Sequence, residues 1–257
     1  MTINQKSLSG QHNSLNGKVA FVQGGSRGIG AAIAQRLARD GAAVALTYAN
    51  SEKLALQVVS AIEAEGGRAL ALRADSADAT ALRQAIDTAA TAFGGLDILV
   101  NNAGVATLAP LEEFKLEDFD RIVAVNVRGV FVATQAAVRY MKEGGRVITI
   151  GSTNAERVPF IGAAAYAMSK AALVGLTKGL ARDLGPRGIT VNNVQPGPVD
   201  TDMNPDEGEF AASLKNLMAI KRYGSAEEIA GFVAYLAGPE SSYITGANLL
   251  IDGGFAA

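Results

Sequence analysis

Short apolar runs alternate with longer amphipathic segments along almost the whole chain. The run KVAFVQ at 18–23 is typical of a buried strand, and in the segment that follows it Ile29, Ile33 and Leu37 lie on one helical face. The same alternation predicts strands at 18–23, 42–48, 68–74, 96–102, 145–152, 188–195 and 247–252, and helices near 28–41, 51–67, 78–92, 117–141, 163–184, 208–219 and 226–237.

Strand and helix take turns over the full length, which indicates right-handed βαβ units and a parallel sheet covered on both faces. No Pro- or Ser-rich linker divides the sequence, and no internal repeat is evident. We therefore predict an α/β protein with one doubly wound domain over 17–257, preceded by a flexible N-terminal extension over 1–16. In such a sheet a ligand sits beyond the carboxyl ends of the strands.

Composition excludes several classes of chemistry. The 257 residues include no cysteine and a single histidine, and the net charge is -2. Disulfides, thiolate metal sites and a Ser-His-Asp triad are thus ruled out or nearly so, and His12 falls in the polar extension. We expect no metal site, and no nucleic-acid partner because that would need a basic face.

Nothing in the sequence suggests a membrane protein. No apolar run approaches the about 18 residues that a membrane span needs, and the first residues lack the apolar region of a signal peptide. The absence of cysteine is compatible with a reducing compartment. We expect a cytoplasmic protein with no membrane partner.

A glycine cluster follows the first predicted strand. Gly24, Gly28 and Gly30 lie at the strand end, the turn and the helix start. There the backbone can approach a pyrophosphate, and the helix N-terminus offers free N–H groups. Glycines also mark plain turns, but the position between a buried strand and an amphipathic helix favours a nucleotide site.

The second strand predicts which nucleotide is bound. NAD-preferring sites place an acid there to hold the ribose 2′-hydroxyl, whereas TYANS at 47–51 has no acid before Glu52. Arg27, inside the glycine loop, suits a 2′-phosphate. We therefore predict NADPH over NADH, with Arg27, Asn50 and Ser51 near the phosphate. The alternative is that Arg27 is an ordinary solvent-facing loop residue.

A tyrosine and a lysine stand four residues apart in the alanine-rich segment AAAYAMSKAAL at 163–173. Positions i and i+4 share a helical face, so Lys170 would lower the pKa of Tyr166 towards that of a working acid. Neutral tyrosine could then protonate the alkoxide formed when hydride adds to a carbonyl. The alternative is a solvated pair on a helix surface.

The surroundings favour the chemical interpretation. Ser152 ends the strand RVITIGS and could hydrogen-bond a substrate carbonyl. Asn126 lies inside a predicted helix, where asparagine is mildly unfavourable, so a specific polar role is expected. The sequences NNAG at 101–104 and PGPVDTD at 196–202 end two further strands.

Together these motifs resemble the short-chain dehydrogenase/reductase family over roughly residues 17–257. The resemblance implies a Rossmann sheet of seven strands and a homotetramer, and it agrees with the NADP(H) cofactor that the second strand and Arg27 predict. It also implies Tyr166 as acid/base, Lys170 as ribose ligand and tuner of Tyr166, Ser152 as the carbonyl-polarising group and Asn126 as holder of a relay water. The cofactor residues expected are Gly24, Ser26, Arg27, Gly28, Ile29, Gly30, Tyr48, Asn50, Ser51, Asp75, Ser76, Asn102, Ala103, Gly104, Tyr166, Lys170, Pro196, Gly197, Val199 and Thr201. By the same resemblance, Asp75 and Ser76 would flank the adenine, Asn102 would contact the ribose, and Val199 and Thr201 the carboxamide.

One position departs from the family pattern. Gln23 stands where threonine is usual, just before the first loop glycine. This substitution removes an expected local hydrogen bond and leaves the cofactor prediction unchanged.

Two subgroups are similar to this chain. The first, 3-oxoacyl-acyl-carrier-protein reductases, reduces a β-keto thioester and meets an acidic carrier through basic residues. Arg187 matches one such position, whereas the other falls in a short loop where Glu143 accompanies Lys142. The second subgroup, cyclic-di-GMP-binding biofilm dispersal mediators, keeps the reductase residues but is described as binding a nucleotide.

Two functions thus remain open: an NADPH-dependent reductase of a small-molecule ketone, keto ester or oxoacyl thioester, and a nucleotide-binding regulator. The complete set of reacting groups favours the enzyme, because a binding protein needs no tuned acid. The segment 202–222 would form a substrate lid or, alternatively, a packing helix. Its Leu214, Leu217 and Met218 could face core or substrate, and Thr153, Asn154 and Phe160 are expected to line the pocket.

Overall fold

The computed structural model describes residues 14–257, which form a seven-stranded parallel sheet with order β3-β2-β1-β4-β5-β6-β7. The strands are β1 (Val19–Gln23), β2 (Ala43–Tyr48), β3 (Ala69–Arg73), β4 (Ile98–Asn101), β5 (Arg146–Ile150), β6 (Thr190–Pro196) and β7 (Asn248–Ile251). The predicted doubly wound sheet is confirmed. The order reverses between β1 and β4, where such folds bind ligands.

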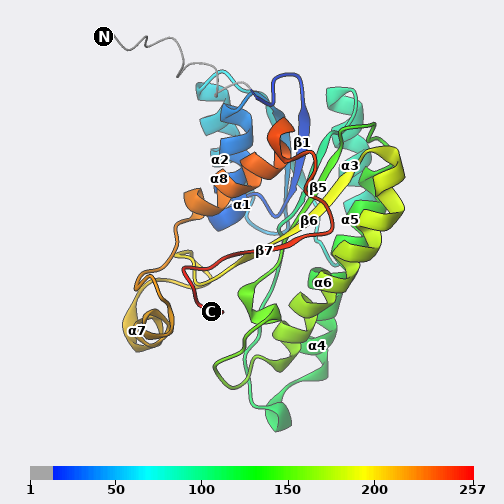
Figure 1. Ribbon diagram of the computed structural model, residues 1–257. Helices are drawn as coiled ribbons and strands as arrows, with labels where there is room; N and C mark the ends of the chain where they lie inside the picture. The colour runs from blue at the N-terminus through cyan, green and yellow to red at the C-terminus, as the bar shows by residue number, and fades with distance from the viewer. Residues whose placement is uncertain (1–13) are drawn as a thin grey trace.

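Helices cover both faces of the sheet (Figure 1). The longer ones are α1 (Gly28–Arg39), α2 (Glu52–Ala64), α3 (Ala79–Phe93), α4 (Leu116–Val123), α5 (Gly129–Ala137), α6 (Ala164–Leu184), α7 (Gly208–Leu217) and α8 (Ala226–Ala237). Apolar side chains of α1, α2 and α8 form one core with the sheet, and those of α3, α5 and α6 form the other. α7 stands apart from both layers, beyond the strand ends.

The predicted helix over 117–141 is interrupted and shorter. α4 passes into a π-helical turn, η3 (Ala124–Arg128), before α5 begins, and α5 ends at Ala137. Arg187 donates from Nη2 to the carbonyls of Val138 (2.6 Å) and Met141 (3.1 Å), which holds the chain in a turn after α5. The turn after α5 is thus stabilised by an arginine that is distant in sequence, which the local apolar pattern does not reveal.

The boundary of the N-terminal extension also differs from the prediction. Leu15, which we placed in the extension, is buried in the core, and its N–H donates to the carbonyl of Asp40 at 2.9 Å. The packed chain therefore includes residues before 17. His12 and the rest of 1–13 lie outside the described residues.

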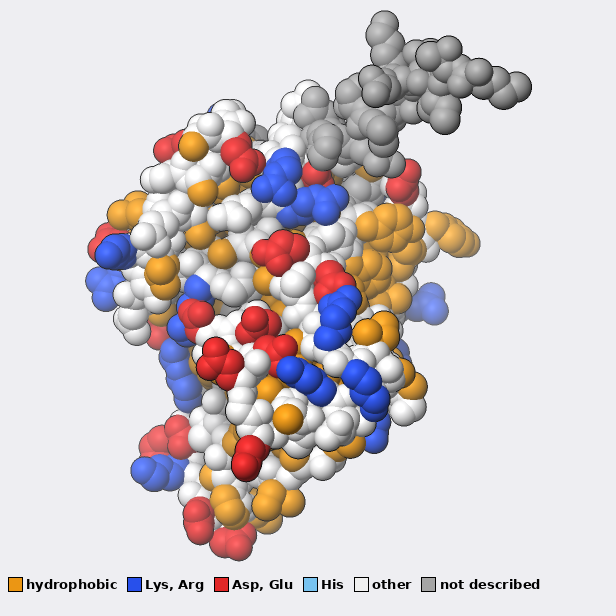
Figure 2. Space-filling view, turned by 90° about the vertical axis from the view of Figure 1, so that its left-hand side faces the viewer, with side chains coloured by type: hydrophobic (Ala, Val, Ile, Leu, Met, Phe, Trp, Pro, Cys, Tyr) orange, Lys and Arg blue, Asp and Glu red, His pale blue; other side chains and the backbone are white. Residues whose placement is uncertain are grey.

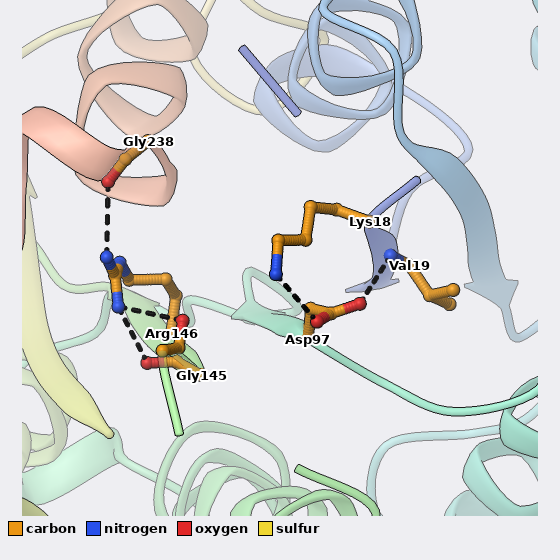
Figure 3. Close-up of polar contacts among 7 residues, drawn as sticks. Lys18, Val19, Asp97, Gly145, Arg146 and Gly238 are labelled. Carbon is orange, nitrogen blue, oxygen red and sulfur yellow. Dashed lines mark hydrogen bonds and ion pairs between the residues drawn. The ribbon is translucent and has the colours of Figure 1, made fainter. Parts of the chain in front are cut away.

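Charged groups fix the edge of the sheet where the strands begin (Figure 3). Asp97, before β4, accepts from Lys18 Nζ at 3.1 Å and from the Val19 N–H at 2.9 Å. Arg146, at the start of β5, donates to the carbonyls of Gly145 (3.2 Å) and Gly238 (3.3 Å). This edge is occupied by structural contacts, which leaves the opposite edge for a site.

Over the described residues, no helix is long and apolar enough to cross a membrane.

Candidate active site

A cleft of about 630 Å³ opens along the carboxyl ends of the strands. Every predicted cofactor residue lines it, from the glycine loop through Tyr48 and Asp75 to Val199 and Thr201. Ser152, Tyr166 and Lys170 line the same cleft. The topology therefore gathers into one groove positions that are more than 170 residues apart in sequence.

The glycine loop is packed too tightly for side chains. A Cβ at Gly30 would lie 2.2 Å from the carbonyl oxygen of Gly24 and 2.4 Å from Asn102 Nδ2, and Gly24 itself has φ +68°. Asn102 Nδ2 donates to the Gly24 carbonyl at 2.8 Å, and the Gly24 N–H donates to Thr47 Oγ1 at 2.9 Å. Thr47 of β2 and Asn102, the residue after β4, thus hold the loop at the start of α1, where N–H groups remain for an anion.

The ends of β2 and β3 form the far part of the cleft. Tyr48 Oη donates to Glu52 Oε1 at 3.1 Å, so Glu52, the first acidic residue of α2, already has a hydrogen-bond partner. Burial raises the pKa of Asp75, but hydrogen bonds from Arg121 Nη1 (3.0 Å) and the Ala77 N–H outweigh it and lower the pKa below its usual value. Asp75 is therefore a carboxylate at neutral pH.

Arg27 is exposed and still lines the cleft, as do Asn50 and Ser51. Its Nη1 lies 3.8 Å from Asp202 Oδ2, a long contact between two exposed groups. Such a pair is weak, so the guanidinium can turn to another anion at small cost.

Tyr166 and Lys170 are not a solvated pair. Lys170 is buried, its Nζ donates to the Ile150 carbonyl at 2.9 Å, and the ammonium lies 5.7 Å from the centroid of the Tyr166 ring. Burial lowers the pKa of Lys170 to about 8. Burial also raises the pKa of Tyr166, and a hydrogen bond with Ser152 opposes that rise. The pKa of Tyr166 is thus raised overall, because burial outweighs the hydrogen bond with Ser152, and a lowering effect of Lys170 stays a prediction.

Ser152 is placed by a short helical turn. Its Oγ accepts from the Asn154 N–H at 3.1 Å and donates to Asn154 Oδ1 at 3.2 Å, capping η4 (Thr153–Ala155). The next residue, Thr153, donates from Oγ1 to Asp252 Oδ2 at 3.1 Å, which ties this turn to the C-terminal segment. Thr153, Asn154 and Phe160 line the cleft, as predicted.

Asn126 is buried and is not one of the residues that line the cleft. Its Oδ1 accepts from the Val105 N–H and its Nδ2 donates to the Val105 carbonyl, both at 2.9 Å, and Nδ2 also donates to Ser169 Oγ at 3.0 Å. The residue sits in the π-helical turn, a feature that often marks functional sites. The polar role expected for it thus includes fastening the loop after β4 to α6, which carries Tyr166.

The lid segment divides between the two predicted roles. Leu214 is buried and lines the cleft. Met218 is buried in the same small core as Leu214 but does not line the cleft, and Leu217 is exposed. α7 is therefore both a packing helix and a wall of the cleft.

Gln23 lacks the local hydrogen bond that threonine usually makes at this position in the family. The side chain is fully buried, and neither Nε2 nor Oε1 has a hydrogen-bond partner within the protein. The loop glycine is held instead by Thr47 and Asn102.

Sequence reasoning missed several residues of the site. Thr47 and Arg121 support the cofactor half, and Asp252 and Phe255 support the other half. Thr47 had a signal, because it is the one hydroxyl in the apolar strand AVALTY apart from the terminal tyrosine. Asp252 and Phe255 had none, since only the path of the chain after β7 brings them to the cleft.

A family model described as enoyl-(acyl carrier protein) reductase matches residues 24–256. A curated relative from Escherichia coli, the cyclic-di-GMP-binding biofilm dispersal mediator protein, is 49% identical over 244 residues, covering 95% of this chain and 99% of its own. The chain belongs to the short-chain dehydrogenase/reductase family. A second member of this family, the 3-oxoacyl-[acyl-carrier-protein] reductase of Synechocystis, is 41% identical over 244 residues, covering 94% of this chain and 98% of its own.

Solved structures agree with this family. A short-chain dehydrogenase/reductase from Serratia marcescens is 72% identical, with TM-score 0.94 over 95% of this chain and 100% of its own. A short chain dehydrogenase from Burkholderia cenocepacia, solved in complex with NADP, is 57% identical, with TM-score 0.94 over 95% of this chain and 100% of its own. The family assignment makes the chain an oxidoreductase.

Proposed function

We propose that the protein is an NADPH-dependent reductase that converts the carbonyl of a ketone or keto ester to an alcohol. The observation that carries this proposal is one continuous cleft with two unlike ends. One end has the glycine loop and Arg27, and the other has Ser152, Tyr166 and Lys170. The NADP complex of the Burkholderia relative supports the choice of cofactor.

The residues fit the cofactor. Gly30 has no room for a Cβ, because the Gly24 carbonyl oxygen lies 2.2 Å from that position, so the backbone of the loop packs closely at the start of α1. A pyrophosphate could meet the free N–H groups of the helix there. Gly24, Gly28 and Gly30 would hold the pyrophosphate, Arg27, Asn50 and Ser51 the 2′-phosphate, and Lys170 the nicotinamide ribose. When bound, NADPH supplies the hydride that reduces the carbonyl carbon.

The protein's own groups supply the proton. Because burial raises the pKa of Tyr166, the phenol is protonated at neutral pH and serves as the acid for the developing alkoxide. Ser152, beside it, donates to the same oxygen and stabilises the charge that forms there. Lys170, protonated below about pH 8, places a positive charge under the ring.

The experiment is NADPH consumption against a panel of acetoacetyl thioester, ethyl acetoacetate, an aryl ketone and a diketone, with NADH as the control cofactor. We expect Tyr166→Phe to abolish turnover and to leave NADPH affinity within a few-fold, because the phenol oxygen is lost while the ring remains. Wild-type turnover by Tyr166→Phe would show that another group is the acid.

A second function is favoured by the 49% identity to the Escherichia coli biofilm dispersal mediator. In that case the protein keeps the reductase fold but acts as a regulator, and its cleft binds a nucleotide that serves as the signal. Titration of the protein with cyclic-di-GMP, in the presence and absence of NADPH, tests this proposal. Competition between the two nucleotides, together with no turnover on the panel, would favour the regulator.

We propose further that the substrate is a free small molecule and that the chain forms a homotetramer. The Synechocystis relative supports a carrier-bound substrate, but Arg187 is bound to two backbone carbonyls here and gives little to a carrier protein. Cytoplasmic location stays a prediction from the sequence.

A further inference from the structure

We infer that Phe160 and Phe210, backed by the buried Phe255, form an aromatic subsite that selects carbonyl compounds carrying an aryl group next to the reacting carbon. This inference rests on the proposed reductase function and specifies its substrate class. All three residues line the same cleft as Ser152 and Tyr166, but the Phe255 side chain is fully buried and supports the wall rather than facing a ligand.

Two of the rings join segments that are distant in sequence. Phe160, after η4, and Phe210, on α7, meet edge to face with centroids 5.7 Å apart and planes at 77°. This is a preferred geometry of aromatic pairs, and the aryl ring of a ligand would pack against an exposed ring in the same way. Phe210 is 49% exposed, so much of its surface is available to a ligand.

The third ring is fixed in place. Arg157 lies over the Phe255 ring, 5.7 Å from its centroid, and its Nη1 donates to the Phe255 carbonyl. Asp252 accepts from the N–H groups of Gly254 and Ala256 at 2.9 Å each, and from Thr153 Oγ1. The contacts of Asp252 join the Phe255 wall to the turn that carries Ser152, so wall and reacting groups are positioned together.

Charge in this part of the cleft favours a neutral ligand. The basic residues that line the cleft are Arg27, Arg121 and Lys170, of which Arg121 faces Asp75 and Arg27 lies nearest Asp202. Leu214 shares a small apolar core with Phe255, against which Phe160 packs, and Leu108 and Met203 are further apolar residues of the cleft lining. Figure 2 shows the side of the molecule that carries α7, where both signs of charge are interspersed with hydrophobic side chains rather than gathered into a basic patch for an acidic carrier.

The test compares two α-keto esters that differ only in the group beside the carbonyl, ethyl benzoylformate (phenyl) and ethyl pyruvate (methyl). We expect the wild type to prefer the phenyl ester in kcat/KM, and Phe210→Ala to lower that preference about tenfold through the loss of ring contact. Leu217→Ala is the matched control, since Leu217 is exposed on the same helix but outside the cleft; it should keep the wild-type preference.

The outcomes separate this inference from the proposed function. If Tyr166→Phe abolishes reduction of both esters but Phe210→Ala keeps the wild-type preference, the reductase stands and the aromatic subsite is wrong. If the wild type reduces neither ester, a binding measurement tests the subsite instead. Calorimetry with NADPH-loaded protein then compares the affinities for the product-like ethyl mandelate (phenyl) and ethyl lactate (methyl). Tighter binding of the mandelate that is lost in Phe210→Ala supports the subsite, and equal affinities overturn it.

Discussion

At the scale of single residues, burial decides the protonation of the reacting pair. Lys170 is buried with one carbonyl partner, and the cost of removing its charge from water lowers its pKa to about 8. An ammonium in that position destabilises the fold, yet it is the group expected to bind the nicotinamide ribose. Stability and activity are therefore in conflict at this residue.

Lys170→Met should stabilise the protein at pH 7 by about 1–3 kcal/mol while removing activity and weakening NADPH binding. The unfolded chain binds the lysine proton up to about pH 10.5 and the folded chain only to about pH 8. Wild-type stability should thus rise between those values, and the advantage of Lys170→Met should shrink over the same range. Chemical denaturation at pH 7 and pH 10 measures this. A less stable variant at pH 7 would contradict the assigned cost of burial.

Arg27 carries the predicted cofactor preference. Arg27→Ala should raise KM for NADPH about ten- to a hundredfold and change KM for NADH little, because only the 2′-phosphate loses a charged hydrogen bond. Arg39→Ala is the control, because Arg39 is an exposed arginine at the end of α1 that pairs with Glu65 outside the cleft. Equal KM values for NADH and NADPH in the wild type would refute the preference itself.

At the scale of elements, Asn126 links three of them: the π-helical turn, the loop after β4 and α6. Asn126→Ala would leave the Val105 N–H and carbonyl without their partner and should cost about 2–4 kcal/mol of stability. The loop lines the cleft, so kcat should fall more than KM rises. Thermal unfolding and steady-state kinetics measure both. An unchanged melting temperature would show that water replaces the amide without loss.

The elements themselves were predictable from the sequence, because strand and helix each have a strong apolar pattern. The position of the cleft was also predictable, because Asn102, Ser152 and Pro196 lie at the ends of predicted strands. The π-helical turn was not predictable, since it depends on bonds from Asn126 to a loop 21 positions away. The wall made by Phe255 was equally hidden, because its place depends on the tertiary path of the last residues.

At the scale of the molecule, the exposed apolar side chains include two sets that lie on separate elements. Leu116, Phe119 and Phe131 are exposed on α4 and α5, and Tyr235 and Leu250 on α8 and β7. β7 is also an edge of the sheet, with unpaired backbone groups. Two self-complementary faces, each used across its own two-fold axis, would generate a tetramer.

Light scattering on the purified protein should therefore give four times the chain mass of 26.4 kDa. Phe131→Glu should remove one interface and leave dimers, because it buries an unpaired charge at the contact. Leu250→Arg should remove the other and also leave dimers, and the two changes together should give monomers. Leu56→Glu is the control, an exposed leucine of α2 that belongs to neither face. A wild type that is monomeric at micromolar concentration would refute both faces, and dimers that persist in the double variant would show that a third surface makes the contact.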